Sequence, residues 1–254
     1  MAEPTLRVEG LTKSFGGVVA TNELNFEIEP GEIHAVIGPN GAGKTTLVAQ
    51  LSGMLKPDAG RIIFLGRDIT GEPAAVRSHL GLARSFQVTS IFSKFTALAN
   101  VALSIQAHRG HSFRFWKPVS ADPALNDPAR KILEDIGLGE RANEIAGNLA
   151  HGEQRQLEIA MALATEPKLL LLDEPTAGMG AEDSERMRKF IGSLKGEISM
   201  LLIEHDMDTV FNLADRVTVL IYGTAIATGT PEEIKQNDEV RAAYLGEDDE
   251  VTYA

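Results

Sequence analysis

A glycine-rich segment that follows a short apolar run constrains the fold of this chain more than any other feature. Residues 33–37 read Ile-His-Ala-Val-Ile, and the next eight read Gly-Pro-Asn-Gly-Ala-Gly-Lys-Thr. A buried strand, a loop of this pattern and a helix together form the phosphate-binding loop of nucleotide-binding α/β proteins. We therefore predict a strand over Ile33–Ile37, a loop over Gly38–Gly43 and a helix from about Lys44 to Met54.

The residue types in this loop suit the binding of a polyphosphate. Glycines let the backbone come close to the ligand, and the loop N–H groups and the helix N-terminus attract negative charge. Lys44 is expected to reach the β- and γ-phosphates, and the Thr45 hydroxyl is expected to bind Mg²⁺. The alternative is a glycine-rich turn without a ligand. If the loop binds a nucleotide, its contacts are Gly38, Pro39, Asn40, Gly41, Ala42, Gly43, Lys44, Thr45 and Thr46.

Two acidic residues follow a second apolar run. Leu169–Leu172 reads as a buried strand, and Asp173 and Glu174 come directly after it. Mg²⁺ prefers carboxylate oxygens, so Asp173 is a candidate ligand of the metal. Glu174 could orient and deprotonate a water molecule beside the γ-phosphate. The alternative is a pair of solvated acids before Pro175.

Composition excludes several classes of protein. The chain has 254 residues and no cysteine, which excludes disulfides, zinc–thiolate sites and thiol nucleophiles. Its net charge of −12 argues against nucleic acid as a partner. It contains no run of roughly 18 apolar residues that could span a bilayer, and its N-terminus lacks the pattern of a signal peptide. We expect a cytoplasmic protein whose contact with a membrane goes through partners.

Apolar runs and turn residues outline an α/β core interrupted by a helical region. The segment from about 87 to 149 has helical pattern and few strand signals, and Pro118, Pro123 and Pro128 predict a long irregular connection within it. Thr230, Pro231 and Glu233 predict the start of a helix. The other predicted elements are strands at Leu6–Val8, Leu24–Ile28, Ile62–Leu65, Lys168–Leu172 and Met200–Ile203, a hairpin of Arg216–Ile221 with Ala225–Thr228, and a helix at Glu153–Ala164.

Several further motifs resemble those of the ABC transporter ATPase family. Leu149-Ala150-His151-Gly152-Glu153 stands before a helix and upstream of Asp173, as the signature motif of that family does. Gln87 resembles the glutamine of its glutamine loop, His205 its switch histidine, and Phe15 the aromatic residue that stacks on adenine. The resemblance extends from Leu6 to Gly246.

The resemblance implies a fold and two ligands. The fold is the P-loop NTPase fold, with a RecA-like core and an antiparallel β subdomain over residues 1–86 and 159–254, and an inserted helical subdomain over residues 87–158. The ligands are ATP and Mg²⁺, with Thr45, Gln87 and Asp173 on the metal.

The resemblance also implies a division of labour between two subunits. The signature residues of one subunit close over the ATP of the facing subunit, while Glu174 and His205 act on the ATP of their own chain. Taken singly, Gln87 could be a surface amide, His205 a structural histidine and Phe15 a core residue.

Two departures from the family pattern lie near the signature and after Glu174. Ala150 replaces a serine, which removes one hydroxyl donor to the γ-phosphate. The aspartate of the dimer-contact loop is replaced within Ala177-Gly178-Met179-Gly180. At both positions the residues resemble those of the importer branch of the family that handles branched-chain amino acids and related polar solutes.

The resemblance implies a place of action and partners. We expect the ATPase subunit of an importer for branched-chain amino acids, urea or amides, held at the cytoplasmic face of the membrane by two permease subunits. It would pair with a second ATPase subunit, identical or a sister, and serve a periplasmic solute-binding protein. A lipopolysaccharide exporter and a soluble ABC ATPase remain alternatives.

Two segments are candidates for contact with the permease. Residues 91–101 offer the apolar side chains Ile91, Phe92 and Phe95 to a docking helix. The aromatic and basic loop 108–117 either packs locally or contacts a permease loop or lipid headgroups.

Overall fold

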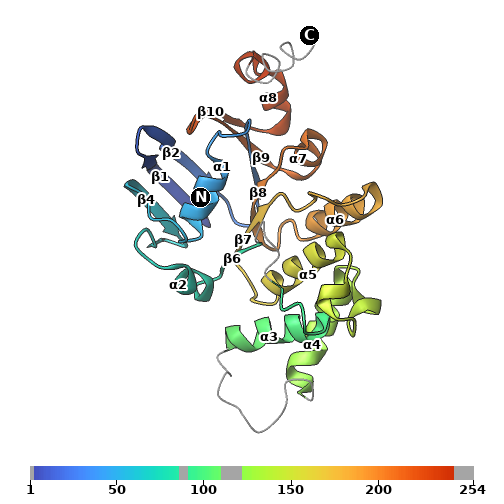
Figure 1. The fold of residues 1–254 in the computed structure, drawn as a ribbon. Helices are drawn as coiled ribbons and strands as arrows, with labels where there is room; N and C mark the ends of the chain where they lie inside the picture. The colour runs from blue at the N-terminus through green and yellow to red at the C-terminus, as the bar shows by residue number, and fades with distance from the viewer. Residues whose placement is uncertain (1–2, 86–90, 110–121, 243–254) are drawn as a thin grey trace. The chain divides into compact units, whose positions relative to one another are not determined.

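The structure is a computed structural model that describes residues 3–85, 91–109 and 122–242 (Figure 1). The chain divides into two compact units. Unit 1 contains the residues up to Arg77 and those from Lys195 onward, and unit 2 contains Ser78–Leu194. The boundaries of the inserted helical subdomain, at residues 87 and 158, stay a prediction.

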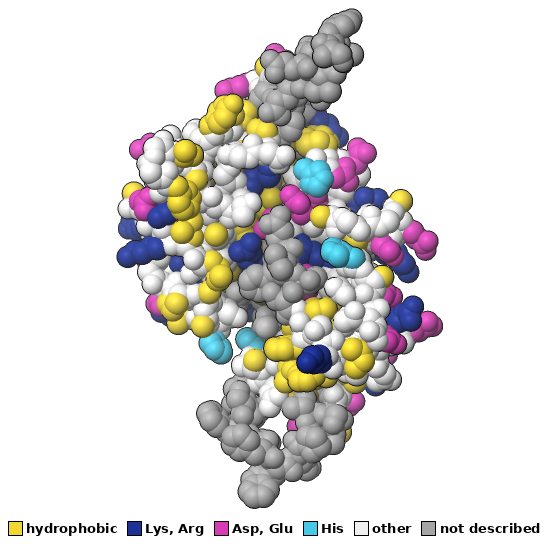
Figure 2. Space-filling model, viewed as in Figure 1, with side chains coloured by type: hydrophobic (Ala, Val, Ile, Leu, Met, Phe, Trp, Pro, Cys, Tyr) yellow, Lys and Arg dark blue, Asp and Glu magenta, His cyan; other side chains and the backbone are white. Residues whose placement is uncertain are grey.

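Unit 1 begins with an antiparallel sheet. Its strands are β1 (Leu6–Phe15), β2 (Val18–Ile28), β4 (Ala59–Phe64) and β5 (Arg67–Asp68), in the order β2-β1-β4-β5. The three predicted strands are confirmed, but β1 and β2 are longer than predicted because their outer halves carry polar residues. Figure 2 shows hydrophobic side chains on the surface over these strands, and Phe15 and Val18 beside the β1–β2 turn are 52% and 67% exposed.

A second group of strands in unit 1 forms its core. β3 (Ile33–Ile37) runs parallel to β8 (Ser199–Ile203) and to β9 (Arg216–Ile221), and β10 (Thr224–Gly229) is antiparallel to β9. Every residue of β3 and β8 is buried, as expected of parallel strands covered on both faces. Tyr222 and Gly223 connect β9 to β10 with φ of 46° and 80°, as in a tight hairpin turn.

Two helices of unit 1, α1 (Lys44–Leu51) and α8 (Pro231–Gln236), begin where the sequence predicts, and α2 (Ala74–His79) and α7 (Met207–Leu213) were not predicted. α1 follows β3, α2 lies at the boundary with unit 2, and α7 follows β8. α8 has the predicted start: the Thr230 hydroxyl accepts from the Glu233 N–H, and Glu233 Oε2 accepts from the Thr230 N–H at 2.8 Å. α1 ends earlier than predicted, before Ser52.

The described residues of unit 2 include a parallel strand pair and the four helices α3 (Ala97–Arg109), α4 (Pro123–Asp135), α5 (His151–Leu163) and α6 (Ala181–Ser193). β6 (Leu82–Arg84) and β7 (Leu169–Asp173) pair in parallel. Short 3-10 turns lie at Gly139–Arg141 and Ala146–Asn148. α3 and α4 lie within the segment from about 87 to 149, where the sequence shows helical pattern.

The predicted irregular connection around Pro123 and Pro128 is wrong, because these prolines lie within α4. Asp122 caps this helix by accepting from the Ala124 N–H at 3.1 Å, and Pro123 takes the first helical position, where its missing N–H costs nothing. Pro128 deprives the Ala124 carbonyl of its helical donor, and Arg109 Nη1 donates to that carbonyl instead at 3.1 Å. Pro118 lies outside the described residues.

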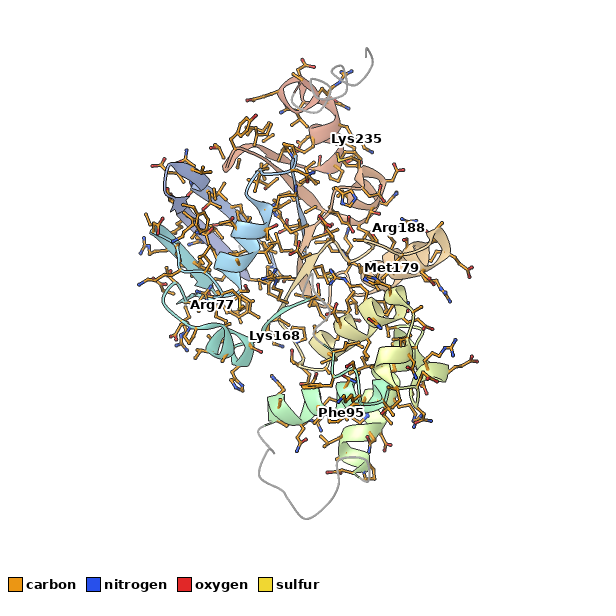
Figure 3. All side chains as sticks on the ribbon, viewed as in Figure 1. Arg77, Phe95, Lys168, Met179, Arg188 and Lys235 are labelled. Carbon is orange, nitrogen blue, oxygen red and sulfur yellow. The ribbon has the colours of Figure 1, made fainter. Side chains whose placement is uncertain are left out.

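A buried arginine closes the end of α1. Arg77 is 1% exposed and donates to four backbone carbonyls, those of Gln50 (2.8 Å), Leu51 (2.7 Å), Thr70 (3.1 Å) and Glu72 (2.9 Å). Arg77 belongs to α2 and is labelled in Figure 3. The last carbonyls of a helix lack intrahelical donors. Arg77 supplies a donor to the Leu51 carbonyl and a second donor, beside the Gly53 N–H, to the Gln50 carbonyl.

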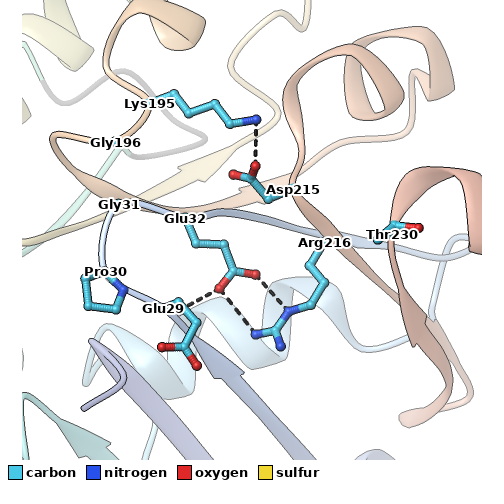
Figure 4. Close-up of a pocket in the computed structure, with 9 residues that line it drawn as sticks. All are labelled: Glu29, Pro30, Gly31, Glu32, Lys195, Gly196, Asp215, Arg216 and Thr230. Carbon is cyan, nitrogen blue, oxygen red and sulfur yellow. Dashed lines mark hydrogen bonds and ion pairs between the residues drawn. The ribbon is translucent and has the colours of Figure 1, made fainter. Parts of the chain in front are cut away.

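A charged cluster lies at the amino ends of β3 and β9 (Figure 4). Glu32 accepts from Arg216 Nε at 2.8 Å and lies 3.2 Å from His34 Nδ1, while Lys195 pairs with Asp215 at 2.8 Å. Burial alone would raise the pKa of Glu32, but the hydrogen bonds from His34 and the Glu29 N–H and the charge of Arg216 bring it below its ordinary value.

This cluster lines an open hollow of about 530 Å³. The hollow lies at the opposite end of β3 from the glycine-rich loop, and its two cations, Lys195 and Arg216, are already paired with carboxylates. The hollow is therefore a poor site for a polyphosphate.

Replacing Arg77 by methionine tests its structural role. We expect the free energy of unfolding to fall by about 3 kcal/mol, because several buried carbonyls lose their donor at once. Urea denaturation measures this change. Arg67→Met, which removes an exposed arginine of β5, is the control and should stay within about 0.5 kcal/mol of the parent chain. An equal loss in the two variants would contradict the assignment.

Candidate functional site

The glycine-rich loop has the strand and helix that the sequence predicts on either side. We call residues 38–46 the phosphate loop; β3 ends at Ile37 before it, and α1 begins at Lys44 within it. A Cβ atom on Gly43 would lie 2.0 Å from the Ala20 carbonyl oxygen, and one on Gly38 would lie 2.2 Å from that of Leu220. Only glycine fits at these two positions, so close packing against β2 and β9 fixes the path of the loop.

The lysine of the phosphate loop folds back over it. Lys44 Nζ donates to the carbonyls of Gly38 and of Pro39, the latter at 3.0 Å. The side chain of Thr45 is exposed on the first turn of α1. The loop therefore presents an ammonium group, a hydroxyl group and the N-terminus of α1, which together suit a phosphate chain.

The turn between β9 and β10 supports the phosphate loop from behind. The Gly223 N–H donates to the Ala42 carbonyl at 3.0 Å, and the Gly223 carbonyl accepts from the Asn22 N–H at 2.8 Å. The turn thus links the loop to β2. The sequence shows Gly223 as a hairpin glycine but gives no sign that it contacts the phosphate loop.

His205 lies at the same end of the strands as the phosphate loop. β3 and β8 are parallel neighbours in which Val36 pairs with Ile203, so the segments that follow them emerge at one edge. The His205 side chain is 67% exposed, and its backbone N–H donates to Glu204 Oε2 at 3.2 Å. The imidazole is exposed at this edge, with its Nδ1 3.8 Å from Glu204 Oε2. Its contact with a γ-phosphate stays a prediction.

Phe15 is not a core residue, so that alternative is wrong. Its ring is about half exposed, and Lys13 Nζ lies 5.7 Å from the ring centroid. An exposed aromatic face can stack on a base. Stacking on adenine stays a prediction.

In unit 2, Asp173 is the last residue of β7 and is 1% exposed. Its Oδ2 lies 3.1 Å from Arg84 Nη2. The alternative of a solvated acid is therefore wrong for Asp173. Gln87, the other candidate metal ligand of this segment, lies outside the described residues.

Glu174 has an unusual backbone. Its φ of 50° is in the left-handed region, which residues with a Cβ rarely adopt. Such conformations persist where surrounding contacts enforce them, and they concentrate at functional sites. The Glu174 carbonyl accepts from the Ala177 N–H at 3.1 Å and from Arg155 Nη2 at 3.3 Å.

The signature residues, Leu149–Glu153, form the start of α5. Glu153 Oε2 accepts from the Ala150 N–H at 2.9 Å, but Ala150 has no side-chain oxygen, so the reciprocal bond of a capping box cannot form. A Cβ on Gly152 would lie 3.5 Å from Met179 Cγ, and a Cβ on Gly178 would lie 3.5 Å from His151 Nδ1. The signature therefore packs against the segment that carries Met179 (Figure 3).

Sequence reasoning missed Arg155. It is 5% exposed, pairs with Glu158 at 3.1 Å and donates through Nη2 to the carbonyl of Asp173 as well as that of Glu174. An arginine followed by an acid three residues later on a buried helical face was the only signal available.

The candidate oxygen donors have the chemistry that Mg²⁺ requires. They belong to different units: Thr45 to unit 1 and Asp173 to unit 2. Mg²⁺ takes one or two protein oxygens and completes its shell with phosphates and water. Thr45 offers a hydroxyl and Asp173 a carboxylate. Across residues 3–85, 91–109 and 122–242, no three His, Cys, Asp or Glu side chains gather as a dedicated metal cage would require.

Comparison with known proteins supports these motifs. The profile of the family described as ABC transporter matches residues 21–177, and that of the branched-chain amino acid ATP-binding cassette transporter matches residues 226–250. The helices that the structure describes include none long and apolar enough to cross a membrane.

Curated relatives match over nearly the whole chain. The high-affinity branched-chain amino acid transport ATP-binding proteins BraF of Pseudomonas aeruginosa and LivG of Escherichia coli are each 40% identical, over 97% of this chain and 100% of theirs. The probable branched-chain amino acid transport ATP-binding protein LivG of Methanocaldococcus jannaschii is 33% identical, over 95% of this chain and 97% of its own.

Solved structures confirm the predicted fold. An ATP-binding cassette of an ABC transporter has a TM-score of 0.84 and 31% identity, covering 96% of this chain and 99% of its own. The ADP conformation of a cassette described in the same words has a TM-score of 0.83 and 31% identity, covering 96% and 100%. With its phosphate loop, signature and buried β-strand acid, and with relatives that match almost end to end, the chain belongs to the ABC transporter family.

Proposed function

We propose that this chain is the ATP-hydrolysing subunit of an importer for branched-chain amino acids or a related polar solute such as urea or an amide. The observation that carries the proposal is the phosphate loop, whose glycines, Lys44 and helix N-terminus have the chemistry of a nucleotide site. The solute class rests on the names of the relatives. This subunit is not expected to touch the solute itself.

Catalysis by this chain is positioning and charge stabilisation. Phosphoryl transfer passes through a loose transition state whose charge lies on the γ-phosphate oxygens. Lys44 and the N–H groups of the phosphate loop stabilise that charge. When bound, Mg²⁺ would supply further neutralisation, and the oxygens of Thr45, Asp173 and Gln87 would hold it. Phe15 stacks on the adenine ring.

The attacking water needs an acceptor for its proton and a fixed direction. Glu174 accepts the proton. It directly follows Asp173, the last residue of the buried strand β7 and a candidate ligand of the metal. His205 orients the water and contacts the γ-phosphate.

A second subunit completes each site. The Gly152 N–H and the N-terminus of α5 are donors for an anion, and we assign them to the γ-phosphate of the facing subunit. Ala150 brings no hydroxyl to that contact, so closure relies on backbone donors. ATP favours the closed dimer because it touches both halves, and hydrolysis removes that preference.

Two permease subunits hold the ATPase dimer at the cytoplasmic face of the membrane, with a periplasmic solute-binding protein delivering the solute.

An apolar surface in unit 2 suits the docking of a permease helix. Phe92 and Phe95 are 53% and 48% exposed, and their ring centroids lie 5.8 Å apart. An amphipathic helix docks on an apolar surface of this kind.

Two substitutions separate binding from chemistry. Lys44→Ala should abolish detectable ATP affinity, because the ammonium is the main side-chain charge on the phosphates. Glu174→Gln should retain ATP affinity, lose hydrolysis by about 10²- to 10⁴-fold and accumulate a dimer with ATP. Fluorescent-nucleotide binding, phosphate release and light scattering measure these effects. Glu197→Gln, at an exposed acid, is the control. Parent-rate hydrolysis by Glu174→Gln would exclude Glu174 as the base.

Transport tests the solute class. A tag on this chain allows the whole transporter complex to be purified from the cells that produce it. The complex is then reconstituted in proteoliposomes with the solute-binding protein. We expect ATP-dependent uptake of labelled leucine that Glu174→Gln abolishes. If only urea or an amide is taken up, the solute must be assigned to that class instead. Export of lipopolysaccharide without any uptake would contradict the assignment as an importer.

A further inference from the structure

We propose that Arg155 is the positioning residue of the catalytic base: it fixes the direction of the Glu174 carboxylate by holding the two peptide groups on either side of it. This inference rests on the proposed function, in which Glu174 accepts the proton of the attacking water. All residues concerned belong to unit 2.

The contacts of Arg155 flank Glu174 in the chain. One terminal nitrogen of the guanidinium, Nη2, donates to two carbonyls. The Asp173 carbonyl precedes the Glu174 Cα in the chain, and the Glu174 carbonyl follows it. The distance from Nη2 to the Glu174 carbonyl oxygen is 3.3 Å. The directions of these two peptide groups set φ and ψ of Glu174. They therefore set the direction of its Cα–Cβ bond, and a guanidinium that binds both restricts where the carboxylate can point.

The backbone of Glu174 needs such a restraint. A residue with a Cβ in the left-handed region stands about 1–3 kcal/mol above its relaxed conformation and keeps that conformation only where its surroundings enforce it. The φ of Glu174 is 50°. Without the Arg155 contacts, we expect the segment to relax toward an ordinary conformation, which would turn the carboxylate away from its water.

The chemistry of arginine explains the choice of residue. A guanidinium is planar and carries several N–H donors in a rigid fork, whereas a lysine ammonium is a single compact group. Arg155 Nη1 pairs with Glu158 at 3.1 Å, and the two side chains are 6% and 4% exposed. The Glu158 carboxylate balances the buried charge of Arg155 through Nη1, which leaves Nη2 to donate to the two carbonyls.

The same contacts join the base to the signature. Arg155 lies on the first turns of α5, just after Gly152, and shares that helix with the donors assigned to the nucleotide of the facing subunit. A displacement of the start of α5 must therefore move the guanidinium that holds Glu174.

Arg155→Lys and Arg155→Gln test this role. With full chains, we expect kcat for ATP hydrolysis to fall at least about tenfold, because a misplaced base loses much of the 10²- to 10⁴-fold contribution of proton transfer. The affinity for a fluorescent ATP analogue should stay within about twofold, since the phosphate loop belongs to unit 1. Arg188→Gln, which removes an arginine of α6, should keep the parent kcat.

A double mutant separates positioning from a general structural role. Once Glu174→Gln has removed the base, adding Arg155→Lys should change neither the residual hydrolysis nor the ATP affinity by more than twofold, because Arg155 acts through Glu174. Further losses in the double mutant would overturn the proposal. Thermal unfolding checks that each variant is folded, and failure of both Arg155 variants to fold would overturn it too.

The possible failures are distinguishable. Parent-rate hydrolysis by Glu174→Gln would reject the assigned base and the inference together. An inactive Glu174→Gln with Arg155 variants at the parent kcat would reject the inference alone and leave the proposed function intact.

Discussion

The structure of unit 1 depends on two places where backbones approach too closely for any side chain. At Gly38 and Gly43 the phosphate loop lies against carbonyl oxygens of β9 and β2. These contacts clamp the loop between a parallel strand of the core and the antiparallel sheet. The N–H groups of such a loop are held in place before a ligand arrives, so binding does not have to order them. The glycine pattern is thus a packing requirement as well as a ligand requirement.

Buried arginines perform a related task elsewhere in the chain. Arg77 holds the carbonyls at the end of α1, and Arg155 holds those around Glu174. In both places the chain turns, and the arginine adds side-chain donors to the carbonyls there, although the Glu174 carbonyl also accepts from the Ala177 N–H and the Gln50 carbonyl from the Gly53 N–H. A guanidinium can satisfy several such groups from one side chain, although its buried charge must be balanced or well hydrogen-bonded. Arg155 has Glu158 for that purpose.

Much of the fold could be predicted because its signals are local. The buried strands β3 and β8 are nearly continuous apolar runs, and Thr230 with Glu233 marks the start of α8 through a capping box. The irregular connection predicted at Pro123 and Pro128 is wrong, because both prolines lie within α4. Asp122 and Arg109 supply the capping acceptor and the replacement donor that allow a helix there.

The candidate site divides in the same way. Lys44 and Asp173 follow from motifs whose residue types suit phosphate and Mg²⁺, whereas the signature follows from its resemblance to the ABC transporter ATPase family. The roles of Gly223 and Arg155 could not be predicted, because each depends on a contact between segments far apart in sequence. The left-handed backbone of Glu174 also leaves no trace in residue type, since glutamate gives no indication of a positive φ.

The central claim is that this chain carries only part of each catalytic centre and that a facing subunit supplies the rest. The dependence of the hydrolysis rate per chain on protein concentration tests it most directly, in a preparation of this chain with its ATPase partner. If the site is shared, the rate per chain rises with concentration and tends to zero on dilution. A rate per chain that stays constant while light scattering shows only monomers would contradict the account.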